Sequence, residues 1–359
     1  MKIAFLTNVS SPYRTIFFNK LGKYYDLDVW YEYRKEPTEK RDKSWENDNA
    51  KYYKAIYTFK LNDLRKYDLI IVCGISTPKE MMAILYMKLK GIKYILEIDG
   101  GFPKKVNFFK KFIKYSLTKG AKYYLSTGDM SDKYLISNGA DESKIIRYHF
   151  SSTLLKETLT KPFLYEEKNK VKDKLEIKKK FNVLFVGRFL ECKGIDTLLK
   201  AVKFFPKDTG VYLIGGELEK NYKEYIAENN LTNIYTIKFL QKEKLKEYYK
   251  AVDLLIFPSR DDIWGLVVNE AVAMGLPVVC SKGTIAGLEL IKNDWNGWIF
   301  NINNYKELAE YVNKFYNLDF EKRYKMMENC IQIAKKYTID EMVKDHIEFI
   351  EKYEVQNSE

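Results

Sequence analysis

The chain has 359 residues with a formal net charge of +12, and 46% of its residues are hydrophobic. This apolar content excludes an intrinsically disordered chain and is enough for two hydrophobic cores, so we expect two domains. No stretch of about 20 residues is free of charges and helix breakers, which argues against a transmembrane helix. The four cysteines are far apart and only two histidines are present. We therefore expect neither a disulfide framework nor a zinc site, and a cytoplasmic location.

The positive charge is concentrated in the first half of the chain. Residues 1–160 carry 29 Lys and Arg against 18 Asp and Glu, whereas the remaining residues are almost neutral. Seven lysines and no acidic residue lie between Gly100 and Gly128. A basic half predicts an anionic partner, either nucleic acid or an anionic membrane; a solvated, lysine-rich surface is the alternative.

In chain order, the first half alternates short apolar runs with segments of helical spacing. The runs are continuous and of strand length, as expected for strands covered by helices on both faces. They lie at residues 2–7, 27–31, 69–73, 94–98 and 123–126. Helical spacing follows the first run, around Ile16, and recurs at 78–90. This βαβα order predicts a parallel, doubly wound sheet.

The pattern restarts after a charged stretch at 168–180. Apolar runs of strand length lie at 183–187, 211–215, 234–237, 254–257 and 277–280. Helices are expected between them, at about 195–205, 220–229, 242–250 and 266–274, and again in the tail at 339–353. The sequence thus predicts an α/β protein with two Rossmann-like, doubly wound halves facing a cleft, where ligands bind beyond the carboxyl ends of the strands.

A loop of the second half carries two cations five residues apart, Arg188 and Lys193. Gly187 before them lets a ligand approach the backbone, and the helix that begins near Ile195 offers free N–H groups. Two fixed cations at the start of a helix suit a diphosphate. An ordinary surface turn is the alternative interpretation.

Two acids, Asp262 and Glu270, lie eight residues apart, the first in a loop and the second on the helix that follows it. Carboxylates there can accept hydrogen bonds from sugar and ribose hydroxyls, and the N–H groups from Gly265 onward can bind phosphate. An acid inside the apolar stretch 266–277 is costly to bury without a partner. A ligand therefore explains Glu270 better than packing does.

Both features resemble those of the retaining nucleotide-sugar glycosyltransferases of family 4, which have the two-domain GT-B fold. The second domain of that family carries a Gly-Arg…Lys-Gly phosphate loop and a Glu-x7-Glu motif leading into Ala-x-Ala-x-Gly-x-Pro-Val. The chain matches with Gly187-Arg188…Lys193-Gly194 and with Glu270-Ala271-Val272-Ala273-Met274-Gly275-Leu276-Pro277-Val278. The resemblance is specific for about 183–300. It departs at the first acid, which is Asp262 rather than Glu, so the identity of the sugar stays open.

The resemblance implies that the chain is divided into three parts. An N-terminal Rossmann-like acceptor-binding domain would span residues 1–158, and a C-terminal Rossmann-like nucleotide-sugar-binding domain would span 159–336. A C-terminal helix within 337–359 would pack back on the first domain.

The resemblance also implies roles in the donor site. Arg188 and Lys193 would hold the donor diphosphate and stabilise the leaving group. Asp262 would contact the sugar ring and take part in catalysis, and Glu270 would contact the ribose. The other expected donor contacts come from loops and helix starts: Gly187, Leu240, Gln241, Gly265, Leu266 and Val267.

The first domain offers two further candidates. Asp99 ends the fourth strand, where many family members have a His, and the two glycines after it leave room for an acceptor hydroxyl. We interpret Asp99 as a catalytic or acceptor-binding residue, with a simple turn Asp as the alternative. Arg14, in the first loop, could reach the diphosphate or the acceptor.

Neither a metal nor another cofactor is expected. The charge of the leaving group would be met by Arg188, Lys193 and the helix start. The segment Asp26-Leu27-Asp28 imitates a metal-binding D-x-D motif, but it opens a strand, and we interpret it as a turn.

Residues 103–122 predict a membrane-binding segment. On a helix, Phe108, Phe109, Phe112 and Ile113 form one stripe flanked by lysines, which is typical of an interfacial helix. The alternative is a stripe that packs on its own sheet.

The resulting hypothesis is a metal-independent, retaining hexosyltransferase. It would move a hexose or N-acetylhexosamine from a nucleotide-sugar, preferentially a UDP-sugar, to a lipid-linked or cell-surface glycan such as capsule or lipopolysaccharide. The protein would be peripheral at the inner face of the cell membrane. The alternatives are a nucleotide-sugar 2-epimerase of the same fold and a non-catalytic protein that binds nucleotide-sugar or nucleic acid. No helix-turn-helix, RNP or zinc-finger pattern supports nucleic acid.

Overall fold

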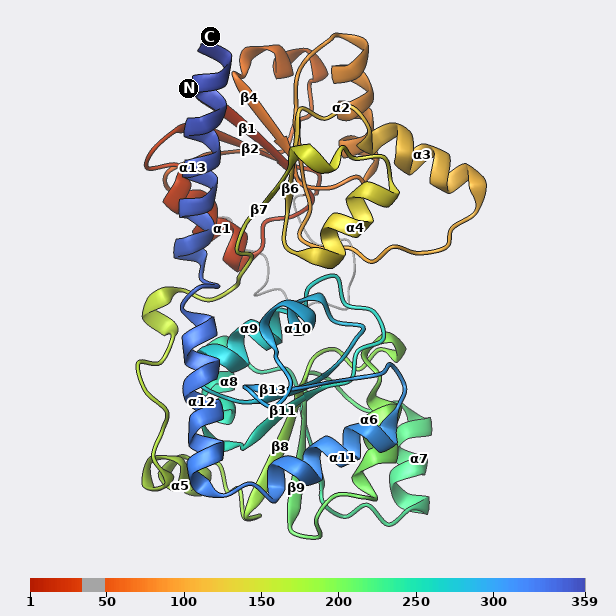
Figure 1. Cartoon of the computed structure of the whole chain (residues 1–359), viewed down its shortest axis with the longest axis vertical. Coiled ribbons are helices and arrows are strands. Elements are labelled where there is room, and N and C mark those ends of the chain that lie inside the picture. Colours follow the sequence, from red (N-terminus) through yellow and green to blue (C-terminus); the bar gives the residue numbers. More distant parts are fainter. Residues whose placement is uncertain (34–48, 359) are drawn as a thin grey trace. The chain divides into compact units, whose positions relative to one another are not determined.

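The computed structural model describes residues 1–33 and 49–358. Contacts divide the chain into two compact domains, Met1–Ser151 with Thr338–Glu359, and Ser152–Tyr337. Each domain is built on one parallel sheet with helices packed against it (Figure 1). The predicted class, two Rossmann-like α/β domains, is confirmed. The boundaries expected from the sequence were 158–159 and 336–337.

The first domain contains a seven-stranded sheet in which every pairing is parallel. In spatial order its strands are β3 (Lys54–Ile56), β2 (Asp26–Tyr31), β1 (Lys2–Thr7), β4 (Leu69–Val72), β5 (Ile95–Glu97), β6 (Tyr123–Ser126) and β7 (Ile145–Arg147). Its helices are α1 (Pro12–Leu21), α2 (Pro78–Leu89), α3 (Phe108–Thr118), α4 (Asp129–Ser137) and α13 (Ile339–Ser358). The strand order reverses between β1 and β4.

The core of this domain explains why the apolar runs became central strands. Leu6 of β1, Val72 of β4 and Leu96 of β5 are completely or almost completely buried. Helix residues such as Ile84 and Leu117 belong to the same hydrophobic cluster. Burial on both faces of the sheet requires runs without polar alternation, which is the pattern that the sequence shows.

The second domain contains a six-stranded parallel sheet. In spatial order its strands are β10 (Ile234–Ile237), β9 (Thr209–Ile214), β8 (Phe181–Val186), β11 (Leu254–Phe257), β12 (Val278–Ser281) and β13 (Gly297–Phe300). Its helices are α5 (Tyr165–Lys174), α6 (Ile195–Val202), α7 (Lys220–Glu228), α8 (Lys242–Ala251), α9 (Leu266–Ala273), α10 (Ile285–Leu290), α11 (Tyr305–Tyr316) and α12 (Phe320–Ala334). The order reverses between β8 and β11, and this reversal is where ligands bind in doubly wound sheets.

Three strands were not predicted, namely β3, β7 and β13. The first two have three residues each and are only partly buried, so they lack a continuous apolar run. The third, Gly-Trp-Ile-Phe, begins with a glycine whose added Cβ would lie 1.9 Å from the carbonyl oxygen of Val278. Short edge strands of this kind are defined by their neighbour in the sheet, which local sequence does not reveal.

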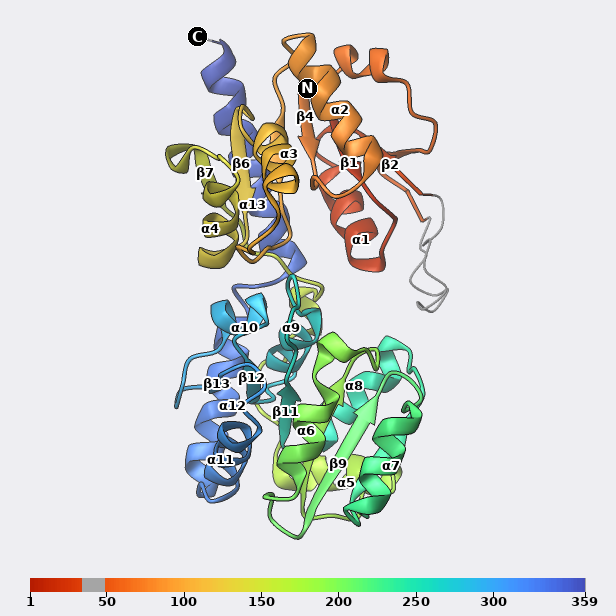
Figure 2. The same ribbon diagram turned by 90° about the vertical axis from the view of Figure 1, so that its right-hand side faces the viewer.

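The C-terminal helix α13 packs on α1 of the first domain, and the two helices lie side by side in Figures 1 and 2. An ion pair joins Lys20 of α1 to Asp340 of α13 at 2.7 Å. The ring of His346 packs against Phe17 of α1, with 4.7 Å between the ring centroids. The last helix therefore completes the face of the first sheet that α1 covers.

Candidate functional site

The predicted phosphate loop lies at the strand-order reversal of the second domain. It leaves the sheet after β8, passes through the short helical turn Glu191–Lys193 and enters α6. Gly194 starts α6 with φ +70°, and an added Cβ would lie 2.1 Å from the carbonyl oxygen of Pro258. Only glycine allows the loop after β8 to pack this closely on the loop after β11.

The ring of Phe257, at the end of β11, brings several predicted donor residues together. The ammonium of Lys193 lies 5.5 Å from the ring centroid. A Cβ added to Gly187 or to Gly265 would lie 3.9 Å or 3.4 Å from the same ring. The loop after β8 and the start of α9 therefore meet over one aromatic side chain.

Lys193 and Asp262 form an ion pair, with 15% and 17% of their side chains exposed. The sequence assigned these residues to the same ligand, and the structure places them in contact. Because both side chains keep some exposed surface, the pair can exchange its contacts with water for contacts with a ligand. Arg188 is half-buried on the same loop, and the described residues offer it no ion-pair partner within 4.0 Å.

Arg260 is a structural residue of the site that sequence reasoning missed. Its guanidinium binds both carboxylate oxygens of Asp196 on α6 at 2.7 Å and also donates to the carbonyl oxygen of Glu191. Its backbone N–H donates to the carbonyl oxygen of Cys192 at 2.7 Å. Arg260 therefore ties the loop of Lys193 to the loop of Asp262. Its place beside the predicted acid was the only signal in the sequence.

The start of α9 is a second possible phosphate contact. Gly265 has φ +99°, and an added Cβ would lie 2.6 Å from Cγ2 of Thr284. The first N–H groups of a helix have no partner within the helix, so those of Leu266 and Val267 are available to a phosphate.

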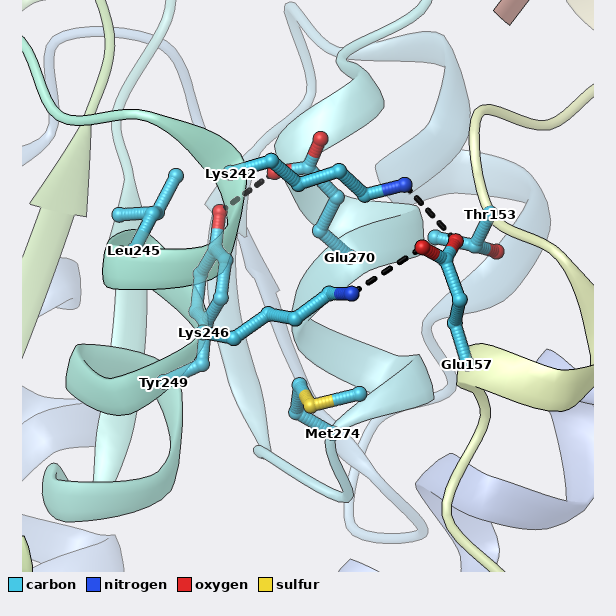
Figure 3. A pocket seen from close by; sticks show the side chains of 8 residues that line it. All are labelled: Thr153, Glu157, Lys242, Leu245, Lys246, Tyr249, Glu270 and Met274. Atoms are coloured by element: carbon cyan, nitrogen blue, oxygen red, sulfur yellow. Dashed lines mark hydrogen bonds and ion pairs between the residues drawn. The ribbon is translucent and has the colours of Figure 1, made fainter.

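Glu270, on α9, lies in a small pocket of the second domain (Figure 3). The pocket is lined by Thr153, Glu157, Lys242, Leu245, Lys246, Tyr249, Glu270 and Met274. The hydroxyl of Tyr249 donates to the Glu270 carboxylate at 2.8 Å. Burial raises the pKa of Glu270, while the Tyr249 hydrogen bond and the charge of Lys242 favour its ionised form. A carboxylate held in this way is suited to accept hydrogen bonds from a pair of hydroxyls.

Two lysines of α8 face the same pocket, and both bind Glu157 (Figure 3). Lys242 lies 2.7 Å and Lys246 3.0 Å from its carboxylate oxygens. The predicted residues Leu240 and Gln241 precede Lys242 at the start of α8, and neither of them lines the pocket. Tyr249 and these lysines were not predicted, since their spacing is that of any amphipathic helix.

In the first domain, the structure joins the two predicted residues Arg14 and Asp99 in an ion pair. Arg14 also binds Glu97 at 2.8 Å, and Tyr148 donates to Asp99 at 3.2 Å. Burial and the charge of Glu97 raise the pKa of Asp99. Only 3% of the Arg14 side chain is exposed against 29% of Asp99. This burial favours a role of Arg14 through Asp99 over direct contact with a ligand.

No group of three potential metal-ligating side chains occurs in the described part of the chain. Asp26 opens β2, as predicted, and Asp28 is buried, accepting a hydrogen bond from the Tyr67 hydroxyl at 2.6 Å. The residues of the D-x-D segment therefore serve the sheet. Independence from metal stays a prediction.

The predicted membrane segment forms α3, whose aromatic stripe faces away from the core. Phe108, Phe109 and Phe112 are 85%, 71% and 60% exposed. Ile113 was expected in the same stripe, but it packs against the hydrophobic cluster of the first domain instead. Among residues 1–33 and 49–358, none of the helices has both the length and the hydropathy needed to cross a bilayer.

The second domain is similar to known glycosyltransferases. Residues 167–337 match the family model described as glycosyl transferases group 1. An uncharacterized glycosyltransferase of Methanocaldococcus jannaschii is 30% identical over 162 residues, 45% of each chain. An uncharacterized protein in the cps region of Klebsiella pneumoniae is 26% identical over 303 residues, 84% of this chain and 75% of that one. The Staphylococcus aureus capsular polysaccharide biosynthesis glycosyltransferase CapM is 26% identical over 236 residues, 62% of this chain and 60% of that one.

Among solved structures, Anabaena HepE in complex with UDP superposes with a TM-score of 0.81 at 17% identity. The superposition covers 98% of this chain and all of that one. This similarity over both domains confirms the predicted GT-B type of fold. Residues 167–337, which match the glycosyl transferases group 1 model, include all the predicted donor-binding residues.

Proposed function

We propose that the chain is a retaining, metal-independent glycosyltransferase that moves a hexose or N-acetylhexosamine from a UDP-sugar to a lipid-linked or cell-surface glycan. The observation that carries this proposal is the ion pair of Lys193 and Asp262, held over Phe257 at the strand-order reversal of a family domain. It sets a cation for the leaving diphosphate beside a carboxylate for the sugar. The similar structure of HepE contains UDP, which supports uracil as the base of the donor.

The donor would be divided among three features of the second domain. Arg188, Lys193 and the first N–H groups of α9 receive the diphosphate, and their positive charge stabilises the nucleoside diphosphate as it leaves. Asp262 accepts hydrogen bonds from the sugar ring. Glu270, oriented by Tyr249, accepts hydrogen bonds from the ribose.

The acceptor would be received by the first domain. Asp99 is the partly exposed carboxylate of a buried polar cluster, and it is suited to orient an acceptor hydroxyl. The exposed aromatic stripe of α3, with Lys110, Lys111 and Lys114 on the same helix, supports peripheral binding to the cytoplasmic face of an anionic membrane. The names of CapM and of the Klebsiella pneumoniae cps region support capsule-like polysaccharide as the product class.

The proposal is tested by incubating the full chain with UDP-sugars, with and without lipid extract, and measuring release of UDP. Release that requires the extract, together with NMR of the product showing the anomeric configuration of the donor, is expected. Activity should persist in EDTA. Release without acceptor and formation of a 2-epimer would indicate the epimerase instead, and binding of UDP-sugar without any turnover would indicate a binding protein.

A further inference from the structure

A continuous series of buried polar contacts runs from the C-terminal helix to Asp99. His346, on α13, has no exposed side-chain surface, and its Nε2 lies 3.1 Å from Oε2 of Glu97. The other carboxylate oxygen of Glu97 accepts a hydrogen bond from Arg14 at 2.8 Å. The second terminal nitrogen of Arg14 donates to Asp99, the most exposed group of the series.

The contacts of His346 define its protonation. Nδ1 lies 2.7 Å from the carbonyl oxygen of Met342, which can only accept, so Nδ1 carries a proton. Burial opposes ionisation of Glu97, but Arg14 and His346 together hold the pKa of that carboxyl at about 2. Because the ionised carboxylate also only accepts, Nε2 must donate as well. His346 is therefore an imidazolium.

The charges of the buried cluster formed by His346, Glu97, Arg14 and Asp99 balance. Two cations, His346 and Arg14, face two carboxylates, Glu97 and Asp99. The hydroxyl of Tyr148 donates to Asp99, and the Tyr148 and His346 ring centroids lie 5.0 Å apart.

The remaining titratable groups near Asp99 are uncharged. Burial raises the pKa of Tyr13, on α1, to about 12, and it raises the pKa of the Cys73 thiol, after β4. Neither group therefore competes for Arg14 as an anion at neutral pH. Among the described residues, the charged groups that act on Asp99 are Arg14 and Glu97, and His346 binds Glu97.

We propose that His346 is a positioning residue that fixes the Asp99 carboxylate through Glu97 and Arg14. His346 neutralises Glu97 at the carboxylate oxygen that Arg14 does not bind. One terminal nitrogen of Arg14 is then left to hold Asp99. The C-terminal helix is thus part of the acceptor side and not only a cover for the sheet. This inference rests on the proposed role of Asp99, and His346 itself touches no substrate.

Two substitutions should act on Asp99 in opposite directions. His346→Gln keeps a hydrogen-bond donor but removes a positive charge, so the uncompensated charge of Glu97 raises the pKa of Asp99 further. Glu97→Gln removes the like charge and lowers the pKa of Asp99. If transfer requires ionised Asp99, the acidic limb of the pH–rate profile should move up in the first variant and down in the second, by about one pH unit each.

The matched control is His149→Gln. His149 also binds a carboxylate of α13, with 2.9 Å between its Nδ1 and Asp345, but it lies outside the cluster. This variant should keep the wild-type profile, and all three variants should bind UDP as the wild type does. Unmoved limbs in both cluster variants, or movement of both in the same direction, would overturn the inference.

The protonation of His346 can be measured without any activity. The chain has only two histidines, so the His149→Gln variant gives one imidazole signal in NMR. That signal should show both ring nitrogens bonded to hydrogen, as the contacts with Met342 and Glu97 require. A ring nitrogen without hydrogen would overturn the inference even if His346→Gln failed to fold. An absence of sugar transfer by the wild type would instead contradict the proposed function and leave this measurement valid.

Discussion

At the scale of single residues, the donor site depends on charged side chains that the fold positions, such as Lys193 and Asp262. Lys193→Ala removes one charge-assisted contact to the diphosphate, so UDP binding should weaken by about 1.5–3 kcal/mol. The fold should remain intact, since Lys193 lies in a loop. Isothermal titration calorimetry with UDP measures the effect. Lys220→Ala, at an exposed lysine of α7, is the control and should bind normally; equal affinity of Lys193→Ala and the wild type would remove Lys193 from the diphosphate site.

The two acids of the motif should respond differently to loss of charge. Glu270→Gln should weaken binding of UDP, because a neutral amide accepts less strongly from the ribose hydroxyls. Asp262→Asn should instead lower turnover and relax the choice of sugar, with UDP affinity less affected. Steady-state kinetics over several UDP-sugars separates the two effects. Wild-type kinetics in both variants would show that the roles carried over from family 4 are wrong.

At the scale of elements, the start of α2 contains a titratable cap. Glu80 accepts hydrogen bonds from the backbone N–H groups of Ser76 and Thr77, both at 3.1 Å. Burial raises the pKa of Glu80 to about 7. At pH values between the ordinary pKa of Glu and this raised value, Glu80 keeps a proton in the folded chain that it has lost in the unfolded chain. Stability should therefore fall as the pH rises through this window, by at most about 1.4 kcal/mol per pH unit.

Urea unfolding between about pH 5 and pH 7.5 tests this cap, with that window taken from the ordinary and raised pKa of Glu. Glu80→Gln should lose less stability over the window than the wild type, because a neutral amide has no proton to release. Glu167→Gln is the matched control, since Glu167 caps α5 in the same way from an exposed position. Parallel curves for Glu80→Gln and the wild type would contradict the prediction.

The helix α3 should bind an anionic membrane. Changing Lys110, Lys111 and Lys114 together to Glu removes three favourable contacts of about 1 kcal/mol each and adds repulsion. Sedimentation with phosphatidylglycerol vesicles should be lost, while UDP binding is kept.

The control for the α3 variant changes three exposed lysines to Glu in the second domain. Lys220, Lys223 and Lys238 are exposed there, and their joint change to Glu should leave vesicle binding intact. Failure of the wild type to sediment at low salt would indicate a soluble acceptor.

At the scale of the whole molecule, the two domains should contribute separable functions. The predicted donor residues all lie within Ser152–Tyr337, whereas Asp99 lies in the other domain. Asp99→Asn should therefore keep the UDP affinity of the wild type and lose turnover. Calorimetry and transfer assays on the same preparation measure both quantities. A loss of UDP affinity in Asp99→Asn would contradict this division.

The sequence by itself determined the class of fold, the central strands and the motif residues. Continuous apolar runs are sufficient for this, because a strand buried on both faces has no polar alternation. Asp262 and Lys193 were also predictable as site residues. Charged residues that follow such apolar runs have no role in the core, so a ligand explains them.

Only the tertiary structure decided which of these residues meet. The ion pairs Lys193–Asp262 and Arg14–Asp99 join residues 69 and 85 positions apart, and no local periodicity encodes such contacts. The same holds for Tyr249 with Glu270 and for His346 with Glu97. Their partners lie on other elements, and parallel packing of distant strands and helices, rather than spacing along the chain, brings them together.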